Sequence, residues 1–390
     1  MTRRGPAEPP ARRSADADPW APLLEALTGC VNCGKCLPDC SLYQLSRREE
    51  DGLRGKINVL RRHLGAGLPP SPAATRLFWR CLLCLRCQDA CPSGIELLRV
   101  LDAARTALHA RGLAPAIDRP GAHRAGAVIR AVRRRQAVSP PPHLRPIRPA
   151  PPRQTLPTAA GDRPATLLVS PLGRAVWGPA LADAVALFRR GGFNPAVRML
   201  RGPSPVRLAW RGDAEGLRAA LAAPFAGAPM PATLLFLEPE LALLWRTHGV
   251  PAEVIDLEGW LLAGGAANSA NDPPFTTLPA PVPMAAADWL DWLGRWRALA
   301  PAAWRPPPIE SRGLRAEPLV PIDPAAARDL ARRWLRLAGT AGAGAVAIAS
   351  PRTQSWLRSS GESAPALRPL AGLAVRWPAA NSLDAPGQMC

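Results

Sequence analysis

The sequence predicts an α+β protein, with a helical N-terminal domain followed by an α/β region. Eight of the nine cysteines fall in two tight groups between residues 30 and 91, and apolar residues around these groups recur at helical spacing. From about residue 161, short apolar runs alternate with amphipathic segments. We therefore expect four parts: a disordered tail (1–20), the helical domain (21–112), a basic proline-rich linker (113–160) and the α/β domain (161–390).

The first domain is predicted to consist of short helices that flank the cysteine groups. Between the groups, apolar residues repeat every three or four positions, as on one face of a helix, and Gly65–Pro72 then breaks the pattern. We interpret these apolar faces as core. The expected helices are Pro22–Thr28, Leu53–Leu64, Ala73–Arg80 and Ile95–Leu108.

The region after residue 161 is predicted to hold a parallel sheet with helices on both faces, because strand-like and helix-like segments alternate. Three tryptophans at helical spacing, Trp289, Trp292 and Trp296, are typical of packing and not of a cofactor site. The expected strands are Thr166–Ser170, Thr233–Leu237, Val254–Asp256 and Ala345–Ala349. The expected helices are Pro179–Arg190, a helix ending near His248, Ala287–Leu299 and Ala325–Leu337.

The chain is strongly basic, with a formal net charge of +19 and a sequence pI of about 11.2. No nucleic-acid reading motif or aromatic stacking platform accompanies this charge, so no nucleic acid is expected as a partner. An acidic redox partner, the inner face of a membrane and a merely solvated arginine-rich surface all remain open. For the linker, a plain spacer and a docking segment for an acidic partner also remain open.

No apolar run reaches the roughly 20 residues that a membrane-spanning helix needs. The segment Met1–Pro19 carries arginines but no apolar run that would make it a secretory signal. We expect the protein in the cytoplasm, with a peripheral position at the inner membrane as an open alternative. In that reducing compartment, grouped cysteines usually bind metal and do not form disulfides.

Both cysteine groups have the spacing C-x₂-C-x₂-C-x₃-C, which two-cluster bacterial ferredoxins use to bind [4Fe–4S] clusters. Three closely spaced cysteines wrap one cluster, and the fourth reaches the other cluster. The sequence thus predicts a helical ferredoxin domain with two [4Fe–4S] clusters. The first cluster is assigned to Cys30, Cys33, Cys36 and Cys91, and the second to Cys81, Cys84, Cys87 and Cys40. Cys390 has no partner cysteine near it and is expected to bind nothing.

Zinc is the alternative metal, but zinc sites typically use a C-x₂-C pair separated by a long gap from the next pair. Here four cysteines stand in each run, which favours iron and sulfur. Lys35 and Arg86 lie just before the third cysteine of their groups. Positive charge at these positions would raise a cluster's reduction potential, whereas side chains pointing to solvent would leave it unchanged. Both readings remain open.

The segment from Cys30 to about Arg105 resembles the iron–sulfur subunit of glycolate oxidase. It is also similar to subunits of lactate-utilisation enzymes, anaerobic glycerol-3-phosphate dehydrogenase and heterodisulfide reductase. Besides the cysteine groups, the context Tyr43-Gln44-Leu45 and Arg54-Gly55-Lys56 carries the narrower resemblance to glycolate oxidase.

The rest of the chain resembles the same family more faintly. Its members carry two copies of a cysteine-rich domain with a Cys-Cys-Gly sequence, which this chain lacks. The corresponding strand ends, Thr166–Leu172, Phe236–Leu241 and Ala349–Arg352, contain no cysteine, and Leu241 stands in the place of one. The resemblance implies a degenerate tandem α/β domain that has lost its metal ligands and acts as a scaffold, a docking surface or a remnant.

The resemblance implies a non-catalytic electron-transfer subunit of an oxidoreductase. A flavoprotein dehydrogenase subunit would oxidise a 2-hydroxy acid, and electrons would continue to a quinone or another carrier. This chain has no Gly-x-Gly-x-x-Gly loop of its own and no evident acid–base group, so no catalytic residue is expected in it. The alternative is a dicluster carrier or scaffold of a heterodisulfide reductase-like complex that acts on no hydroxy acid.

Overall fold

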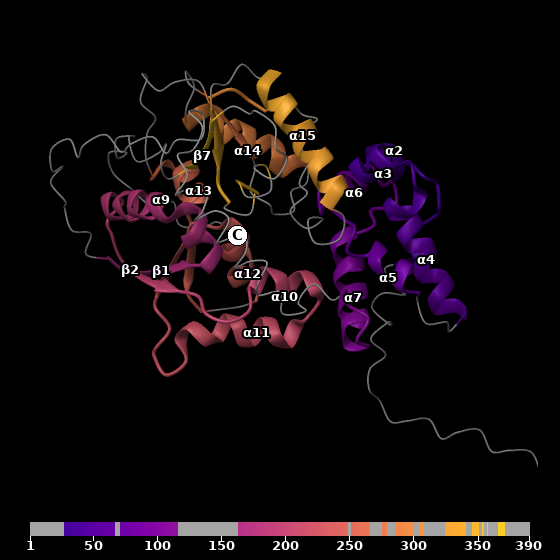
Figure 1. Cartoon of the computed structure of the whole chain (residues 1–390), viewed down its shortest axis with the longest axis horizontal. Helices are drawn as coiled ribbons and strands as arrows, with labels where there is room; N and C mark the ends of the chain where they lie inside the picture. The colour runs from indigo at the N-terminus through magenta and orange to yellow at the C-terminus, as the bar shows by residue number, and fades with distance from the viewer. Residues whose placement is uncertain are drawn as a thin grey trace, which may run out of the picture.

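The computed structural model describes residues 27–66, 71–115, 163–248, 251–265, 275–278, 286–299, 304–307, 324–340, 345–350, 353–354, 357 and 366–370. The expected tail lies outside these residues, as does the expected linker apart from residues 113–115. Figure 1 shows a mixed helical and sheet protein, in which the N-terminal helices lie beside the α/β part.

The N-terminal part is helical, as predicted. The predicted helix Leu53–Leu64 is confirmed as α4, and Ile95–Leu108 corresponds to α7, shifted by two residues. These two helices face each other through a core that includes Ile57 and Leu101, both 0% exposed. The helices are α2 (Cys36–Asp39), α3 (Ser41–Ser46), η1 (Glu49–Asp51), α4 (Leu53–Ala66), α5 (Pro72–Leu77), α6 (Arg86–Asp89) and α7 (Leu97–Ala110).

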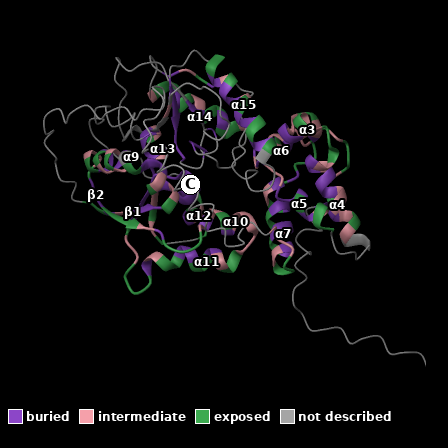
Figure 2. Cartoon of the chain, viewed as in Figure 1, coloured by how far each residue is buried: buried purple, intermediate pink, exposed green. Residues whose placement is uncertain are grey.

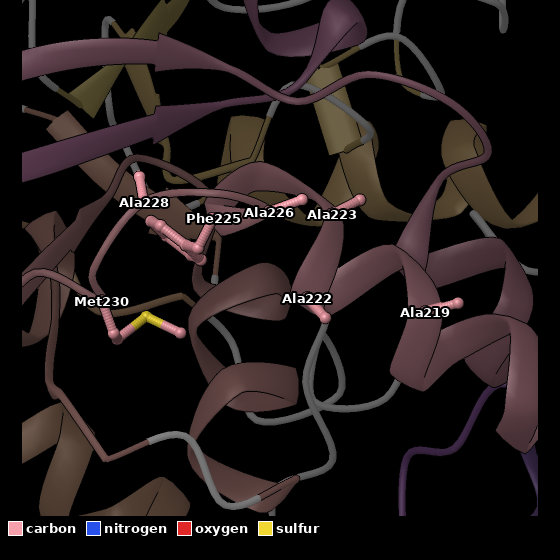
Figure 3. Close-up of a pocket in the computed structure, with 7 residues that line it drawn as sticks. All are labelled: Ala219, Ala222, Ala223, Phe225, Ala226, Ala228 and Met230. Atoms are coloured by element: carbon pink, nitrogen blue, oxygen red, sulfur yellow. The ribbon is translucent and has the colours of Figure 1, made fainter.

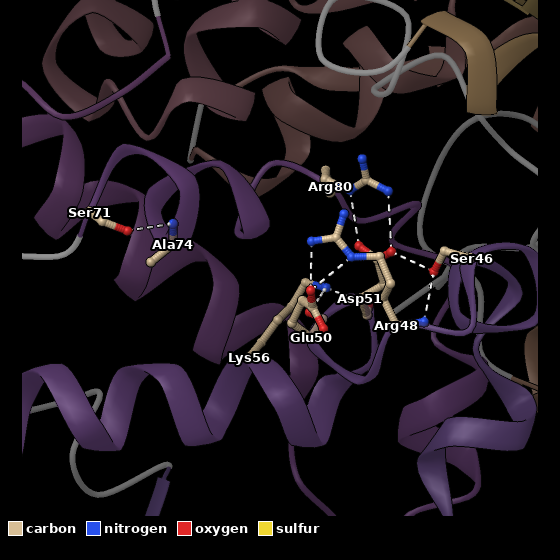
Figure 4. A network of polar contacts seen from close by, with 8 residues as sticks. All are labelled: Ser46, Arg48, Glu50, Asp51, Lys56, Ser71, Ala74 and Arg80. Carbon is tan, nitrogen blue, oxygen red and sulfur yellow. Dashed lines mark hydrogen bonds and ion pairs between the residues drawn. The ribbon is translucent and has the colours of Figure 1, made fainter.

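Two cysteine-containing turns connect these helices. Helix α5 begins at the N-cap residue Ser71, whose Oγ accepts the backbone N–H of Ala74 at 3.1 Å, and it leads towards Cys81 (Figure 4). Of the expected helix Pro22–Thr28, only Leu27 and Thr28 are described, and both are helical.

The α/β part opens with a four-stranded parallel sheet in the order β2–β1–β3–β4. Its strands are β1 (Arg163–Val169), β2 (Phe193–Met199), β3 (Thr233–Phe236) and β4 (Glu253–Asp256). Side chains alternate between the two faces of a strand. Leu167 and Leu235 therefore enter one core cluster, while Leu168 and Phe236 enter another on the opposite face.

Helices cover both faces of this sheet, as predicted, but the expected strand Ala345–Ala349 is not part of it and lies in a second sheet. The face towards Leu167 is covered by α9 (Pro171–Arg190) and α13 (Leu257–Trp260). The opposite face is covered by α10 (Pro205–Arg211), α11 (Ala214–Ala222), η3 (Ala223–Phe225) and α12 (Pro239–Thr247). Helix α9 begins at Pro171, earlier than the predicted Pro179. It has a non-helical residue at Trp177, two positions before that proline, which has no backbone N–H to donate.

A second parallel sheet, in the order β5–β6–β7, contributes to the same core as α9. Its strands are β5 (Phe275–Leu278), β6 (Ala345–Ile348) and β7 (Ala366–Pro369); η4 (Leu261–Gly265), α14 (Ala286–Leu299) and α15 (Pro324–Thr340) accompany them. The packing role predicted for the α14 tryptophans is confirmed, because Trp289 and Trp296 are 1% and 0% exposed. Helix α15 alternates buried and exposed segments, as a helix lying on a core does (Figure 2).

The N-terminal helices dock directly on the α/β part. Trp79 Nε1 donates a hydrogen bond to the carbonyl oxygen of Trp210 at 2.9 Å, and the Arg105 guanidinium lies 5.9 Å from the centre of the Trp210 ring. On another side, α15 runs beside α6 (Figure 1), and Leu82 and Cys84 belong to the same hydrophobic cluster as Trp334 of α15. The two parts therefore share buried surface.

Within the described ranges, no helix has the length and apolar character needed to cross a membrane.

Candidate metal centre

The first cysteine group and the last cysteine of the second group meet at one cavity. Cys30, Cys33, Cys36 and Cys91 all line it, and the apolar side chains of Leu53, Ile57 and Ile95 complete its wall. Burial raises the pKa of the Cys36 thiol, and the charges of Cys30 and Cys91 raise it further. Three residues of one motif and the fourth of the other thus line the same cavity. That they bind one cluster stays a prediction from the spacing.

The remaining cysteines gather at a second place. Burial raises the pKa of Cys87 well above its ordinary value, and the charges of Cys84, Cys81 and Cys40 add to this effect. Burial likewise raises the pKa of Cys40, partly opposed by the charge of Lys56. These pKa directions show that the four thiols lie close enough to influence one another in a poorly solvated place.

The two cysteine turns have the same backbone shape. In the first, Asn32 and Gly34 have φ of 60° and 78°; in the second, the corresponding residues Leu83 and Leu85 have φ of 53° and 59°. Asparagine and glycine tolerate this left-handed conformation, whereas each leucine is strained by roughly 1–2 kcal/mol. The second turn therefore has the same backbone shape as the first, although leucine disfavours a positive φ. This indicates that the same placement of cysteine side chains is required in both turns.

Helix α4 supports the first turn. Asn58 Nδ2 donates to Asn32 Oδ1 at 3.1 Å, and Arg61 Nη2 donates to the carbonyl oxygen of Cys30 at 2.7 Å. Arg54 approaches the same turn, because a Cβ added at Gly34 would lie 2.6 Å from its Nη1. The first turn is thus held by side chains from one rigid element.

The three residues Arg54, Gly55 and Lys56 have three different surroundings. Arg54 lies by the first cysteine group, since the charges of Cys36 and Cys30 contribute to raising its pKa after the larger effect of its hydrogen bond to Glu49. A Cβ at Gly55 would lie 2.3 Å from the carbonyl oxygen of Glu49, so only glycine lets η1 lie this close to α4. Lys56 points the other way and is 1% exposed.

A polar network joins the segments that carry Cys40 and Cys81 (Figure 4). Asp51 is fully buried, and its carboxylate accepts from Arg80 Nε at 2.9 Å, from Arg80 Nη2 at 3.2 Å and from Ser46 Oγ at 2.7 Å. Lys56 Nζ donates to the carbonyl oxygens of Glu50 and Asp51. Arg80 immediately precedes Cys81, so this network fixes where the second group begins relative to η1.

No three His, Cys, Asp or Glu side chains among the described residues converge closely enough to hold a single metal ion.

The sequence pointed to Lys35 and Arg86 as charges beside the clusters. The structure exposes Lys35 and half-buries Arg86, whereas it buries Lys56 and Asp51, which sequence reasoning missed. A signal for Lys56 was present, because it follows Leu53 by three positions and therefore lies near the apolar face of α4.

The α/β part carries no cysteine at the strand ends where the resemblance would put one. Ser170 caps α9, with its Oγ accepting the N–H of Gly173 at 2.9 Å, and Ser350 Oγ donates to Glu240 Oε1 at 2.7 Å. Leu241 is 0% exposed and fills the core. An open hollow of about 530 Å³ beside α11 is lined by alanines, Phe225 and Met230, and its lining includes no cysteine, histidine or carboxylate (Figure 3).

Comparison with known proteins agrees with the cysteine geometry. Residues 26–95 match the family described as "4Fe-4S dicluster domain". The chain is 39% identical over 88 residues to the glycolate oxidase iron-sulfur subunit of Escherichia coli (strain K12), covering 22% of this chain and 21% of that protein. It is 32% identical over 84 residues to the probable glycolate oxidase iron-sulfur subunit of Bacillus subtilis (strain 168), covering 21% of this chain and 19% of that protein.

The match thus spans about a fifth of the length of these curated relatives. No solved structure matches the chain. The N-terminal part is therefore similar to a 4Fe–4S dicluster domain and to the iron–sulfur subunits of glycolate oxidase.

Proposed function

We propose that this chain is the electron-transfer subunit of a flavin-linked 2-hydroxy acid dehydrogenase of the glycolate oxidase kind. The observation that carries the proposal is the crossed arrangement of cysteines, with Cys91 at the cavity of the first group and Cys40 beside Cys81. This arrangement is the one that two adjacent [4Fe–4S] clusters require.

In this proposal the first cluster is held by Cys30, Cys33, Cys36 and Cys91, and the second by Cys81, Cys84, Cys87 and Cys40. Such clusters supply one-electron chemistry when bound. The contact of α2 with α6 and the influence of Cys36 on Cys87 support two neighbouring sites. Short separation favours electron exchange between them.

The two sites differ in their access to solvent, and this gives the electron path a direction. Cys33 is exposed and Val31 beside it is 70% exposed, whereas Cys84 and Cys87 are buried. A redox partner can approach the first site closely without any rearrangement. We therefore propose that the flavoprotein subunit exchanges electrons at the first site.

The α/β part is proposed to be a scaffold that covers the second site. Cys84 and Leu82 pack in one cluster with α15, and the turn after α10 lies against α7. A degenerate tandem domain without metal ligands can still exclude water from the second site. This role explains why the fold would be kept after its cysteines were lost.

An anaerobic experiment tests the function directly. The chain is purified with whatever flavoprotein binds it, glycolate is added, and the EPR spectrum is recorded and compared with that of a dithionite-treated sample. We expect glycolate to give the reduced-cluster signal that dithionite gives. The electron would then continue to a quinone or another carrier, which can be identified by adding acceptors one at a time.

A signal with dithionite but not with glycolate would overturn the hydroxy-acid role and leave a dicluster carrier of the heterodisulfide reductase kind. The described strand ends of the α/β part contain no cysteine. This favours the second candidate, because the α/β part then cannot carry out the metal-dependent chemistry that the resemblance implies for relatives with an intact domain. No signal with either reductant from a preparation that retains its iron would overturn both.

A further inference from the structure

The second cysteine site contains a buried positive charge that the sequence motif does not reveal. Lys56 is 1% exposed, and its Nζ donates to two backbone carbonyl oxygens, those of Glu50 at 3.2 Å and of Asp51 (Figure 4). Carbonyl oxygens carry only partial charge. A buried ammonium held by them alone is costly unless a full negative charge lies near it.

The carboxylates of Glu50 and Asp51, whose backbone carbonyls accept from Lys56, are paired with arginines. Arg80 pairs with Asp51 at 2.9 Å, and Arg48 pairs with Glu50 at 2.6 Å. In the part of the chain that the structure describes, no carboxylate forms an ion pair with Lys56. The protein therefore leaves one buried positive charge without a carboxylate partner.

A cysteine sulfur lies beside this charge. The carbonyl oxygen of Asp51 accepts from Lys56 Nζ and also from Cys40 Sγ, which is 3.6 Å away. The ammonium and the sulfur thus meet at one oxygen atom. Once Cys40 is a thiolate it no longer donates to that oxygen, and a negative sulfur then faces the ammonium.

We propose that Lys56 tunes the second site, because its ammonium stabilises the additional negative charge of the reduced cluster held by Cys40, Cys81, Cys84 and Cys87. A cluster with four thiolate ligands is negative, and one-electron reduction makes it more so. A fixed positive charge in a poorly solvated place favours the reduced form and raises the reduction potential. This inference rests on the proposed cluster assignment.

Arg54 provides a matched comparison on the same helix. It is two residues from Lys56, its charge acts on Cys36 and Cys30, and its side chain is 26% exposed. The two cations therefore face different cysteine groups. Removing each should act on a different cluster, with the smaller effect for the more solvated Arg54.

The test is an anaerobic redox titration of the full chain with both clusters loaded, followed by EPR. For Lys56→Met, we expect one of the two reduction steps to move to lower potential, with about a tenfold fall in the reduced-to-oxidised ratio, or about 59 mV for a one-electron couple. Lys56→Arg should restore most of this shift. Arg54→Met should move only the other step, and Lys35→Met, an exposed lysine, should move neither.

Several outcomes would overturn the inference: unmoved steps in Lys56→Met, the same step moving in Lys56→Met and Arg54→Met, or no recovery in Lys56→Arg. If Lys56→Met loses iron, Lys56→Gln keeps a donor for the Asp51 carbonyl and is titrated in its place. If both neutral variants lose one cluster and Lys56→Arg keeps it, the positive charge is what stabilises the cluster, as proposed. If all three variants lose it, the proposed role of the charge is overturned. A wild-type chain without two reducible clusters would instead contradict the proposed function.

Discussion

Asp51 and Arg80 form a two-point contact across 29 residues of chain, with Oδ1 and Oδ2 of the carboxylate accepting from Nε and Nη2 of the guanidinium. Arg80 is the residue before Cys81, and Asp51 offers its own carbonyl to Cys40. One aspartate therefore sets the distance between the segments that carry two proposed ligands of the second site.

Asp51→Asn should destabilise the N-terminal domain by about 3 kcal/mol, because it leaves Arg80 without its buried counter-charge. Denaturant midpoints of the loaded protein, measured anaerobically, give the change. Glu50→Gln is the control, since the Arg48–Glu50 pair is exposed and should be worth about 0.5 kcal/mol or less. Equal shifts in the two variants would contradict a special role for Asp51.

Pairs of cysteine substitutions test the crossed ligand sets. If Cys33 and Cys91 serve one cluster, Cys33→Ser/Cys91→Ser should lose no more iron than either single variant, about half of the total. Cys87→Ser/Cys91→Ser should lose nearly all of it, because each substitution then removes a ligand of a different cluster. Iron and acid-labile sulfide analysis measures both.

The reverse pattern, with the Cys87 pair retaining half of the iron, would show that each motif binds its own cluster. Cys390→Ser serves as the control and should keep all of the iron. Cys390 lies outside the described residues, and its bystander role remains a prediction from the sequence.

Stability should fall as the pH rises through neutrality because of Glu258. Burial raises the pKa of this carboxyl to about 7, although Trp292 and Trp296 donate N–H bonds that favour its ionised form. Because the carboxyl binds its proton more tightly in the folded state, it contributes stability that is fully present below the pKa of the unfolded state. That contribution is lost as the pH rises through the pKa of the folded state. The loss from about pH 5 to pH 9 should approach 3 kcal/mol.

Glu258→Gln should abolish this pH dependence, because an amide can accept from Trp292 without ionising. Denaturant midpoints at several pH values measure the effect, and Glu253→Gln, on an exposed side chain, should keep the wild-type profile. A wild-type midpoint that does not change across this range would show that Glu258 stays ionised in the fold.

Gly212→Ala should separate the α/β part from the N-terminal helices. Gly212 has φ of 80°, and an added Cβ would lie 2.5 Å from the backbone carbon of Arg105 in α7. Gly202→Ala is matched in backbone strain, with φ of 81°, but its Cβ would meet nothing within 4 Å. Gly212→Ala should therefore cost about 1–3 kcal/mol more than Gly202→Ala.

The contact between Gly212 and α7 leads to a second expected result, which concerns the second cluster. In Gly212→Ala the second cluster should bleach faster in air than in Gly202→Ala, because the α/β part then covers it less well. The decay of the visible absorbance and the EPR signal of each cluster report this. Identical decay in the two variants would contradict the proposal that the α/β part shields the second cluster.

The elements that the sequence predicted well are those defined by local pattern. Helix α4 follows from leucines at helical spacing, and β1 and β3 follow from short apolar runs. Strand β2 was missed because Pro195 lies inside it, and proline is normally read as excluding a strand. Order β2–β1–β3–β4 puts β2 at the sheet edge, where a missing N–H is tolerated.

The candidate site likewise has a part that the sequence predicted and a part that it did not. Cysteine spacing alone predicted the two ligand sets, and Cys30 and Cys91 do line one cavity, although the binding of clusters there stays a prediction. The surroundings could not be predicted, because they depend on contacts between distant segments, such as Arg80 with Asp51 and Trp79 with Trp210. A motif specifies ligands, whereas tertiary packing decides which charges stand beside them.

Burial of the second cysteine group has a consequence for how the protein is made. Cys84 and Cys87 lie within packed core, and Cys84 shares that core with the α/β part. Under the proposed cluster assignment, iron and sulfide would have to reach Cys84 before the α/β part closes over it, or after it opens again. Because the ribosome delivers the cysteine groups first, the proposal favours metal insertion during synthesis, followed by closure as the C-terminal half emerges.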